Sequence, residues 1–174
     1  MNDISPPSPR LAGIVAVFES PDRAEAAVAA LQGAGFDARK LSIVATDRHS
    51  GEHLLGVATS GGRVRFWGRC GPTWDRLAQR LPGAATVFAP FLGYVVVLGA
   101  LAGALVDDRP QHGAVEGATP LWRLLARIGI PSREALGFEY ALREDDILLL
   151  AAGAPGDLLE ARNLLRETAR QLAR

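Results

Sequence analysis

The chain has 174 residues, of which 48% are hydrophobic, enough for one domain with a substantial core. Lys and Arg number 19 and Asp and Glu also number 19, so the net charge is zero and nucleic-acid binding is not expected. The single cysteine, Cys70, excludes an internal disulfide and a multi-cysteine metal site, and it fits a reducing, cytoplasmic compartment.

The N-terminal residues 1–10, MNDISPPSPR, are polar and rich in Pro and Ser, with no apolar run after a basic start. This composition is typical of a flexible tail and not of a secretory signal. We therefore expect one α/β domain over residues 11–174.

Residues 11–46 predict a β-α-β unit. The apolar run 11–18 indicates a buried strand, and Ser20 can cap a helix that has Pro21 in its first turn. A second strand is expected over residues 40–46, parallel to the first. The helix has one apolar stripe, formed by Ala24, Ala27, Val28 and Leu31.

The C-terminal part predicts three helices and a third buried strand. One helix starts at Thr119-Pro120, and another follows the break at Ile130-Pro131-Ser132. The strand is ILLLAA, and the last helix opens at Gly156-Asp157. Its apolar stripe is Leu158, Ala161, Leu165, Ala169 and Leu172.

Three buried strands need one shared sheet to hide their edges and faces. The fold class expected is α+β, as a ferredoxin-like β-α-β…α-β sandwich closed by the two ends of the chain. Residues 53–59 are a candidate fourth strand. Residues 61–117 are then a helical, apolar, Gly-rich insertion.

Several stretches resemble a known family. FESPDRAEAAVAALQGAGF followed by KLSIVA is similar to the opening of the bacterial general stress protein 17M-like family. EHLLGVATSGGRVRFWGRCGPTW and IGIPSREALGFEYALREDDILLLAAG resemble stretches of a proteobacterial subgroup with an apolar Gly-rich middle segment. The resemblance implies a small α/β domain linked to stress, without a catalytic residue or cofactor to transfer. The subgroup has two apolar helices in this middle segment, whereas here Arg123 and Arg127 interrupt the second.

Residues 84–106 form an apolar run without a charged side chain. With Pro90 in the first turn, the expected helix is Phe91–Val106, about 24 Å long at 1.5 Å per residue. This is shorter than the ~30 Å hydrocarbon core, and a single crossing would separate strands that share a sheet. Two interpretations remain: burial in a helical bundle with other subunits, or a helix lying in a membrane interface.

Three glycines suggest what this helix contacts. Gly99 and Gly103 have the small-xxx-small spacing that lets another helix backbone approach closely. The residues expected to mediate helix association are Gly93, Gly99 and Gly103.

The segment before the apolar run mixes basic and aromatic residues. Such a mixture suits a lipid-headgroup or other anion-binding surface. The alternative is an ordinary amphipathic helix, with Trp74, Leu77, Ala78 and Leu81 on its buried face. The candidate headgroup residues are Arg63, Arg65, Arg69, Arg76, Trp67 and Trp74.

His49, Glu52 and His53 form an H-x-x-E-H pattern, which is the inverted zinc-peptidase signature. That chemistry needs both imidazoles on one helical face, but Ser50-Gly51 indicates a turn directly after a strand. A solvated loop is favoured, with metal binding by these residues as a remote alternative.

The sequence therefore predicts a non-enzymatic, stress-associated protein that self-associates through its apolar Gly-rich helix, with room for a hydrophobic ligand. The expected assembly is a homo-oligomer in the cytoplasm, without a cofactor. The alternative is a peripheral or integral membrane protein anchored to lipid by residues 63–106. No constellation of residues indicates a catalytic site.

Overall fold

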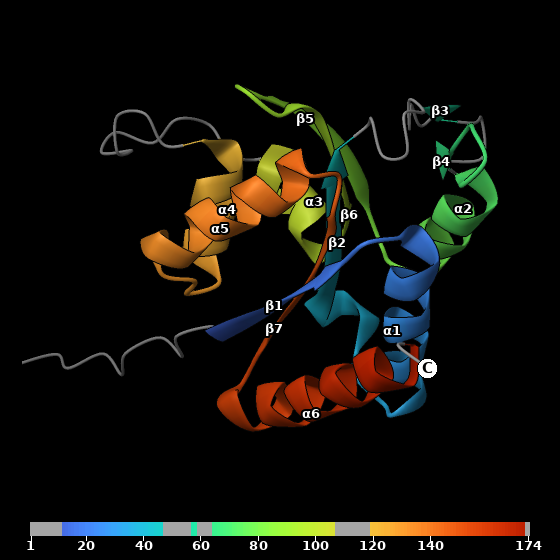
Figure 1. The fold of residues 1–174 in the computed structure, drawn as a ribbon, viewed down its shortest axis with the longest axis vertical. Coiled ribbons are helices and arrows are strands. Elements are labelled where there is room, and N and C mark those ends of the chain that lie inside the picture. Colours follow the sequence, from blue (N-terminus) through green and yellow to red (C-terminus); the bar gives the residue numbers. More distant parts are fainter. Residues whose placement is uncertain (1–11, 47–56, 59–63, 107–118, 173–174) are drawn as a thin grey trace, which may run out of the picture.

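The computed structural model describes residues 12–46, 57–58, 64–106 and 119–172. At its centre is a five-stranded antiparallel sheet with the strand order β1-β7-β2-β6-β5 (Figure 1). β1 and β5 are therefore the two edges of this sheet. The strands are β1 (Ala12–Phe18), β2 (Leu41–Thr46), β5 (Ala84–Ala89), β6 (Gly93–Gly99) and β7 (Ile147–Gly153).

Helices cover both faces of the sheet, which gives three layers (Figure 1). A short 3₁₀ helix, η1 (Ala38–Lys40), leads into β2. One face carries α1 (Pro21–Gly33), α2 (Gly71–Arg80) and α6 (Pro155–Leu172). The other carries α3 (Ala100–Val106), α4 (Pro120–Arg127) and α5 (Ser132–Arg143).

The N-terminal β-α-β unit is confirmed, with one addition. Ser20 caps α1 by accepting a hydrogen bond from the Arg23 backbone N–H, and the predicted apolar stripe of α1 is buried. β1 and β2 are parallel to each other because both pair antiparallel with β7, which lies between them. The two strands are thus not neighbours.

The C-terminal elements also follow the prediction. The Thr119 hydroxyl accepts a hydrogen bond from Trp122 N–H and caps α4, and α5 begins at Ser132 after the expected break. β7 is buried at every residue except Ala152, which is half-buried. The inner face of α6 is buried at Leu158, Ala161 and Leu165.

Residues 84–106 differ from the prediction. They form the hairpin of β5 and β6 followed by α3, so the expected helix over Phe91–Val106 is wrong for residues 93–99. On β6, Val95 and Val97 pack under α3, α4 and α5, while Val96 and Leu98 pack under α1, α2 and α6. A strand buried on both faces lacks charged residues for the same reason as a membrane helix does.

Pro90 lies in the hairpin turn and not at the start of a helix. The Leu92 N–H donates to the Ala89 carbonyl at 3.1 Å and closes the turn. Pro90 suits the second position of a type II turn, and Phe91 at the third has a φ of 67°. Gly93, with a φ of 84°, then starts β6.

The expected ferredoxin-like arrangement needs two corrections. Helices cover both faces of the sheet instead of one, and β5 and β6 belong to the sheet, so residues 61–117 are not a purely helical insertion. Of the candidate strand 53–59, residues 53–56 and 59 lie outside the described residues. Its remainder, β3 (Val57–Ala58), pairs with β4 (Val64–Arg65) in a separate two-stranded sheet.

The three glycines do not share a helical face. Gly93 and Gly99 begin and end β6, and only Gly103 lies in a helix. Gly99 has a φ of 95°, and a Cβ there would lie 2.2 Å from the backbone oxygen of Leu41. A Cβ at Gly103 would meet nothing within 4 Å. The expected helix-association site at Gly93, Gly99 and Gly103 is therefore wrong.

Gly99 and Gly103 should respond oppositely to substitution by alanine. Gly99→Ala is expected to lower the free energy of unfolding by more than about 2 kcal/mol, through a backbone clash and a left-handed φ. Gly103→Ala should leave it unchanged or raise it by up to about 1 kcal/mol, because alanine is the better helix former. Urea denaturation followed by circular dichroism measures both, and equal effects would contradict the assignment of Gly99 to a close strand contact.

Candidate functional site

The outer edge strand β5 is the first candidate surface. Its sequence, AATVFA, carries no charge, and among the described residues it pairs with β6 on one side only. Ala85 and Val87 pack toward α3 and α4, whereas Phe88 on the opposite face is 61% exposed. Within the part of the chain that the structure describes, β5 therefore presents an edge without a neighbouring strand beside an exposed apolar side chain.

Aromatic residues continue this surface around the end of the hairpin. Phe88 packs edge-on against Tyr94 of β6, with ring centroids 5.5 Å apart, and Tyr94 is 51% exposed. Phe91 in the turn is 86% exposed, with the Arg143 guanidinium 6.0 Å from its ring centroid. Solvent-facing aromatic groups of this kind are typical of contact surfaces.

The amphipathic interpretation of residues 71–81 is confirmed. Trp74 and Leu77 on α2 are fully buried, and Leu81 directly after it is 1% exposed. Phe66 packs against Trp74 with ring centroids 6.0 Å apart. Trp74 is thus a core residue, and its place in a lipid-headgroup surface is wrong.

Arg76 is engaged within the protein. Its guanidinium lies 2.8 Å from the Glu25 carboxylate of α1 and also donates to the Thr73 hydroxyl. The hydrogen bond to Glu25 is the main cause that raises the pKa of Arg76 above its ordinary value. This pair joins α1 to α2 over the core.

The remaining candidate headgroup residues are exposed or undescribed. Arg65, Trp67 and Arg69 follow one another around the start of α2, and Trp67 is 61% exposed. Arg63 lies outside the described residues. The structure thus divides the predicted basic and aromatic set between the core, an ion pair and the surface.

The metal candidates His49, Glu52 and His53 lie outside the described residues. Within the described ranges, no group of three or more His, Cys, Asp or Glu side chains is placed to hold a metal ion. The helices described here include none that is both long and apolar enough to cross a bilayer.

Comparison with known proteins gives one finding. Residues 13–66 match the family model of the heat induced stress protein YflT domain, which confirms the resemblance to a general stress protein family over this part of the chain. The match spans β1, α1, β2, β3 and β4. Searches of curated proteins and of solved structures found no significant match.

The two tryptophans near α2 should behave differently on truncation. Trp74→Ala is expected to lower the free energy of unfolding by about 3–5 kcal/mol, since it empties a fully buried site. Trp67→Ala should change it by no more than about 0.5 kcal/mol. Thermal and urea unfolding measure both, and a strongly destabilised Trp67→Ala variant would contradict its surface position.

Proposed function

We propose that this protein is a non-enzymatic, stress-associated assembly protein whose copies join edge to edge through β5. The match of residues 13–66 to a heat-induced stress protein domain supports the stress-associated role. The uncharged free edge of β5 is the observation that carries the assembly role.

Strand β5 is suited to pairing with a second copy of itself. In an antiparallel pair centred on Thr86, Ala84 of one copy lies opposite Phe88 of the other, and Ala85 lies opposite Val87. Each pair places a small side chain opposite a larger one. The Ala84–Phe88 pairs lie on one face of the sheet and the Ala85–Val87 pairs on the other. The two sheets would join into one continuous sheet about a two-fold axis.

β5 also lacks the features by which natural proteins protect sheet edges. No lysine, no other charge and no proline lies within residues 84–89. An unprotected edge with exposed Phe88 invites strand pairing, so a partner that covers it also removes an aggregation hazard. This replaces the helix-based self-association expected from the sequence with pairing of strands.

One lysine on each edge strand tests this proposal. Thr86→Lys places two like charges face to face at the centre of the β5 pair and is expected to give single copies. Val17→Lys, on β1, is the matched control and should retain the assembly. Light scattering coupled to size-exclusion chromatography measures the mass, and circular dichroism checks that both variants fold.

Two results would overturn the assembly role. The first is a wild-type protein that stays a single copy at all concentrations, and the second is equal loss of assembly in Thr86→Lys and Val17→Lys. Cosedimentation with anionic vesicles tests the membrane alternative. Binding that Trp67→Ala abolishes, in a protein of single copies, would assign the function to lipid contact at the exposed Trp67.

A further inference from the structure

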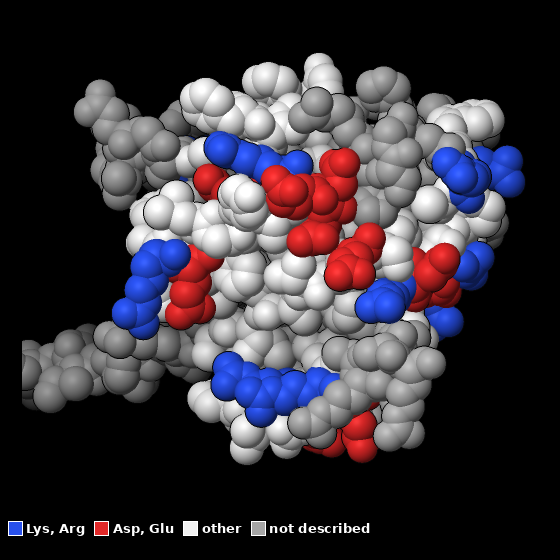
Figure 2. All heavy atoms as spheres, viewed as in Figure 1, with Lys and Arg blue, Asp and Glu red and all other residues white. Residues whose placement is uncertain are grey.

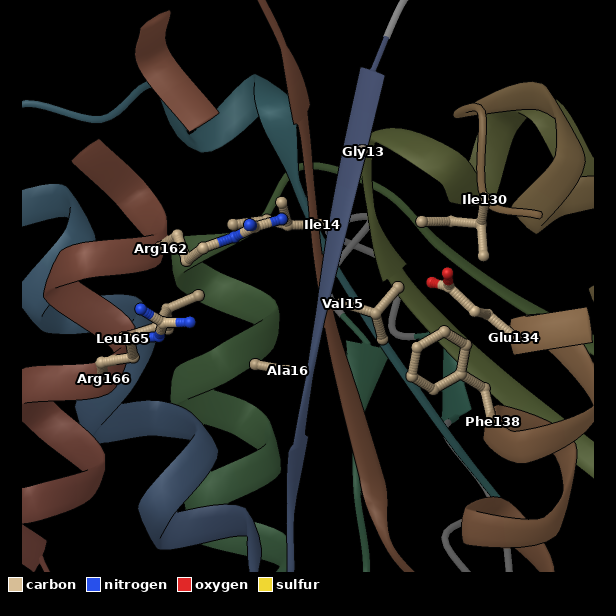
Figure 3. A pocket seen from close by; sticks show the side chains of 10 residues that line it. All are labelled: Gly13, Ile14, Val15, Ala16, Ile130, Glu134, Phe138, Arg162, Leu165 and Arg166. Atoms are coloured by element: carbon tan, nitrogen blue, oxygen red, sulfur yellow. The ribbon is translucent and has the colours of Figure 1, made fainter. Parts of the chain in front are cut away.

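The opposite edge of the sheet, β1, forms the floor of a groove of about 430 Å³. Helix α5 forms one wall and helix α6 forms the other (Figure 3). A Cβ at Gly13 would lie 2.7 Å from the backbone oxygen of Ile128, so glycine lets the connection between α4 and α5 approach one end of β1. The groove thus follows the edge of a seven-residue strand that pairs only with β7 among the described residues.

The two walls differ in chemistry. The wall on the α5 side is formed by Ile130, which precedes the helix, and by Glu134 and Phe138 within it. Val15 of β1 points toward Phe138 (Figure 3). Arg162 and Arg166 line the side of α6, both extending toward β1 (Figure 3). Figure 2 shows basic side chains along α6 on this face of the molecule.

We infer that this groove binds an extended peptide segment of a partner protein, in which acidic and apolar residues alternate, as a strand added to β1. Every second residue of an edge strand directs its N–H and C=O groups outward, where an incoming backbone can pair with them. Alternate side chains of that strand face opposite walls. One set meets the arginines and the other meets Ile130 and Phe138.

The spacing of the arginines matches such a strand. Arg162 and Arg166 are one helical turn apart, about 6 Å along the axis of α6. Side chains on one face of a strand are about 6.7 Å apart, so two successive acidic residues on that face can each reach one guanidinium. Glu134 on the opposite wall disfavours acidic residues there, which sets the alternation of the bound segment.

Strand β1 of a second copy of this chain is a poor fit for this groove. Antiparallel pairing of two β1 strands about a two-fold axis perpendicular to the sheet would bring α6 beside its own copy. Arg162 and Arg166 would then face identical arginines, and this like-charge contact is unfavourable. The two edges of the sheet therefore suit different partners, a second copy at β5 and an acidic peptide at β1.

The experiment uses a fluorescently labelled nonapeptide in which glutamate and valine alternate, and a second nonapeptide with lysine in place of glutamate. Fluorescence anisotropy is expected to show saturable binding of the glutamate peptide that weakens with salt, and little binding of the lysine peptide. Hydrogen exchange should slow at outward-facing amides of β1 on binding, and not at those of β5. That slowing is the signature of an added strand.

A double charge reversal, Arg162→Glu with Arg166→Glu, should weaken binding of the glutamate peptide at least about tenfold and favour the lysine peptide. Arg65→Glu with Arg133→Glu is the matched control, since it changes the net charge equally at exposed sites off the groove, and it should bind as wild type. No binding of the glutamate peptide would overturn the inference. So would equal loss in both double variants, or exchange protection at β5. These outcomes do not depend on self-association, because the Thr86→Lys variant is expected to bind the peptide normally.

Discussion

The pairing of β7 with β1 and β2 at the same time is the constraint on which the rest of the structure depends. Residues from Ile147 to Gly153 pair with β1 in an unbroken register, and Leu148 to Ala151 also pair with β2. The last strand of the chain thus closes the gap that the first β-α-β unit leaves open. With β7 between β1 and β2, the sheet continues beyond β2 with β6 and β5, and β1 is its other edge among the described residues.

This arrangement gives the molecule two edges with different surroundings. β5 is uncharged and ends near exposed aromatic residues, whereas β1 lies between an apolar wall on α5 and a basic wall on α6. In the proposed roles, both edge strands offer backbone groups to a partner, and the side chains beside each strand would decide which partner it accepts.

Local signals in the sequence predicted those elements whose ends carry their own caps. Ser20 and Thr119 mark the starts of α1 and α4, and their side chains accept the expected hydrogen bonds. The spacing of Trp74 and Leu77 likewise predicted the buried face of α2. The apolar run 84–106 was ambiguous, because a strand covered by helices on both faces and a membrane helix both exclude charge. Pro90 and Gly93 carried the missing signal, since Pro90 suits the hairpin turn and Gly93, directly after the turn, takes a positive φ.

Sequence patterns were enough to predict the helix caps, the apolar faces of α1 and α2, the strands β1, β2 and β7, and the resemblance to a general stress protein family. The three-dimensional arrangement was needed to see that residues 84–99 form a hairpin, that Gly99 lies against Leu41, and that Arg162 and Arg166 lie beside the edge strand β1. The reason is physical. Caps and stripes depend on neighbours within a few residues, whereas strand order, edges and grooves depend on pairing between segments far apart in the chain.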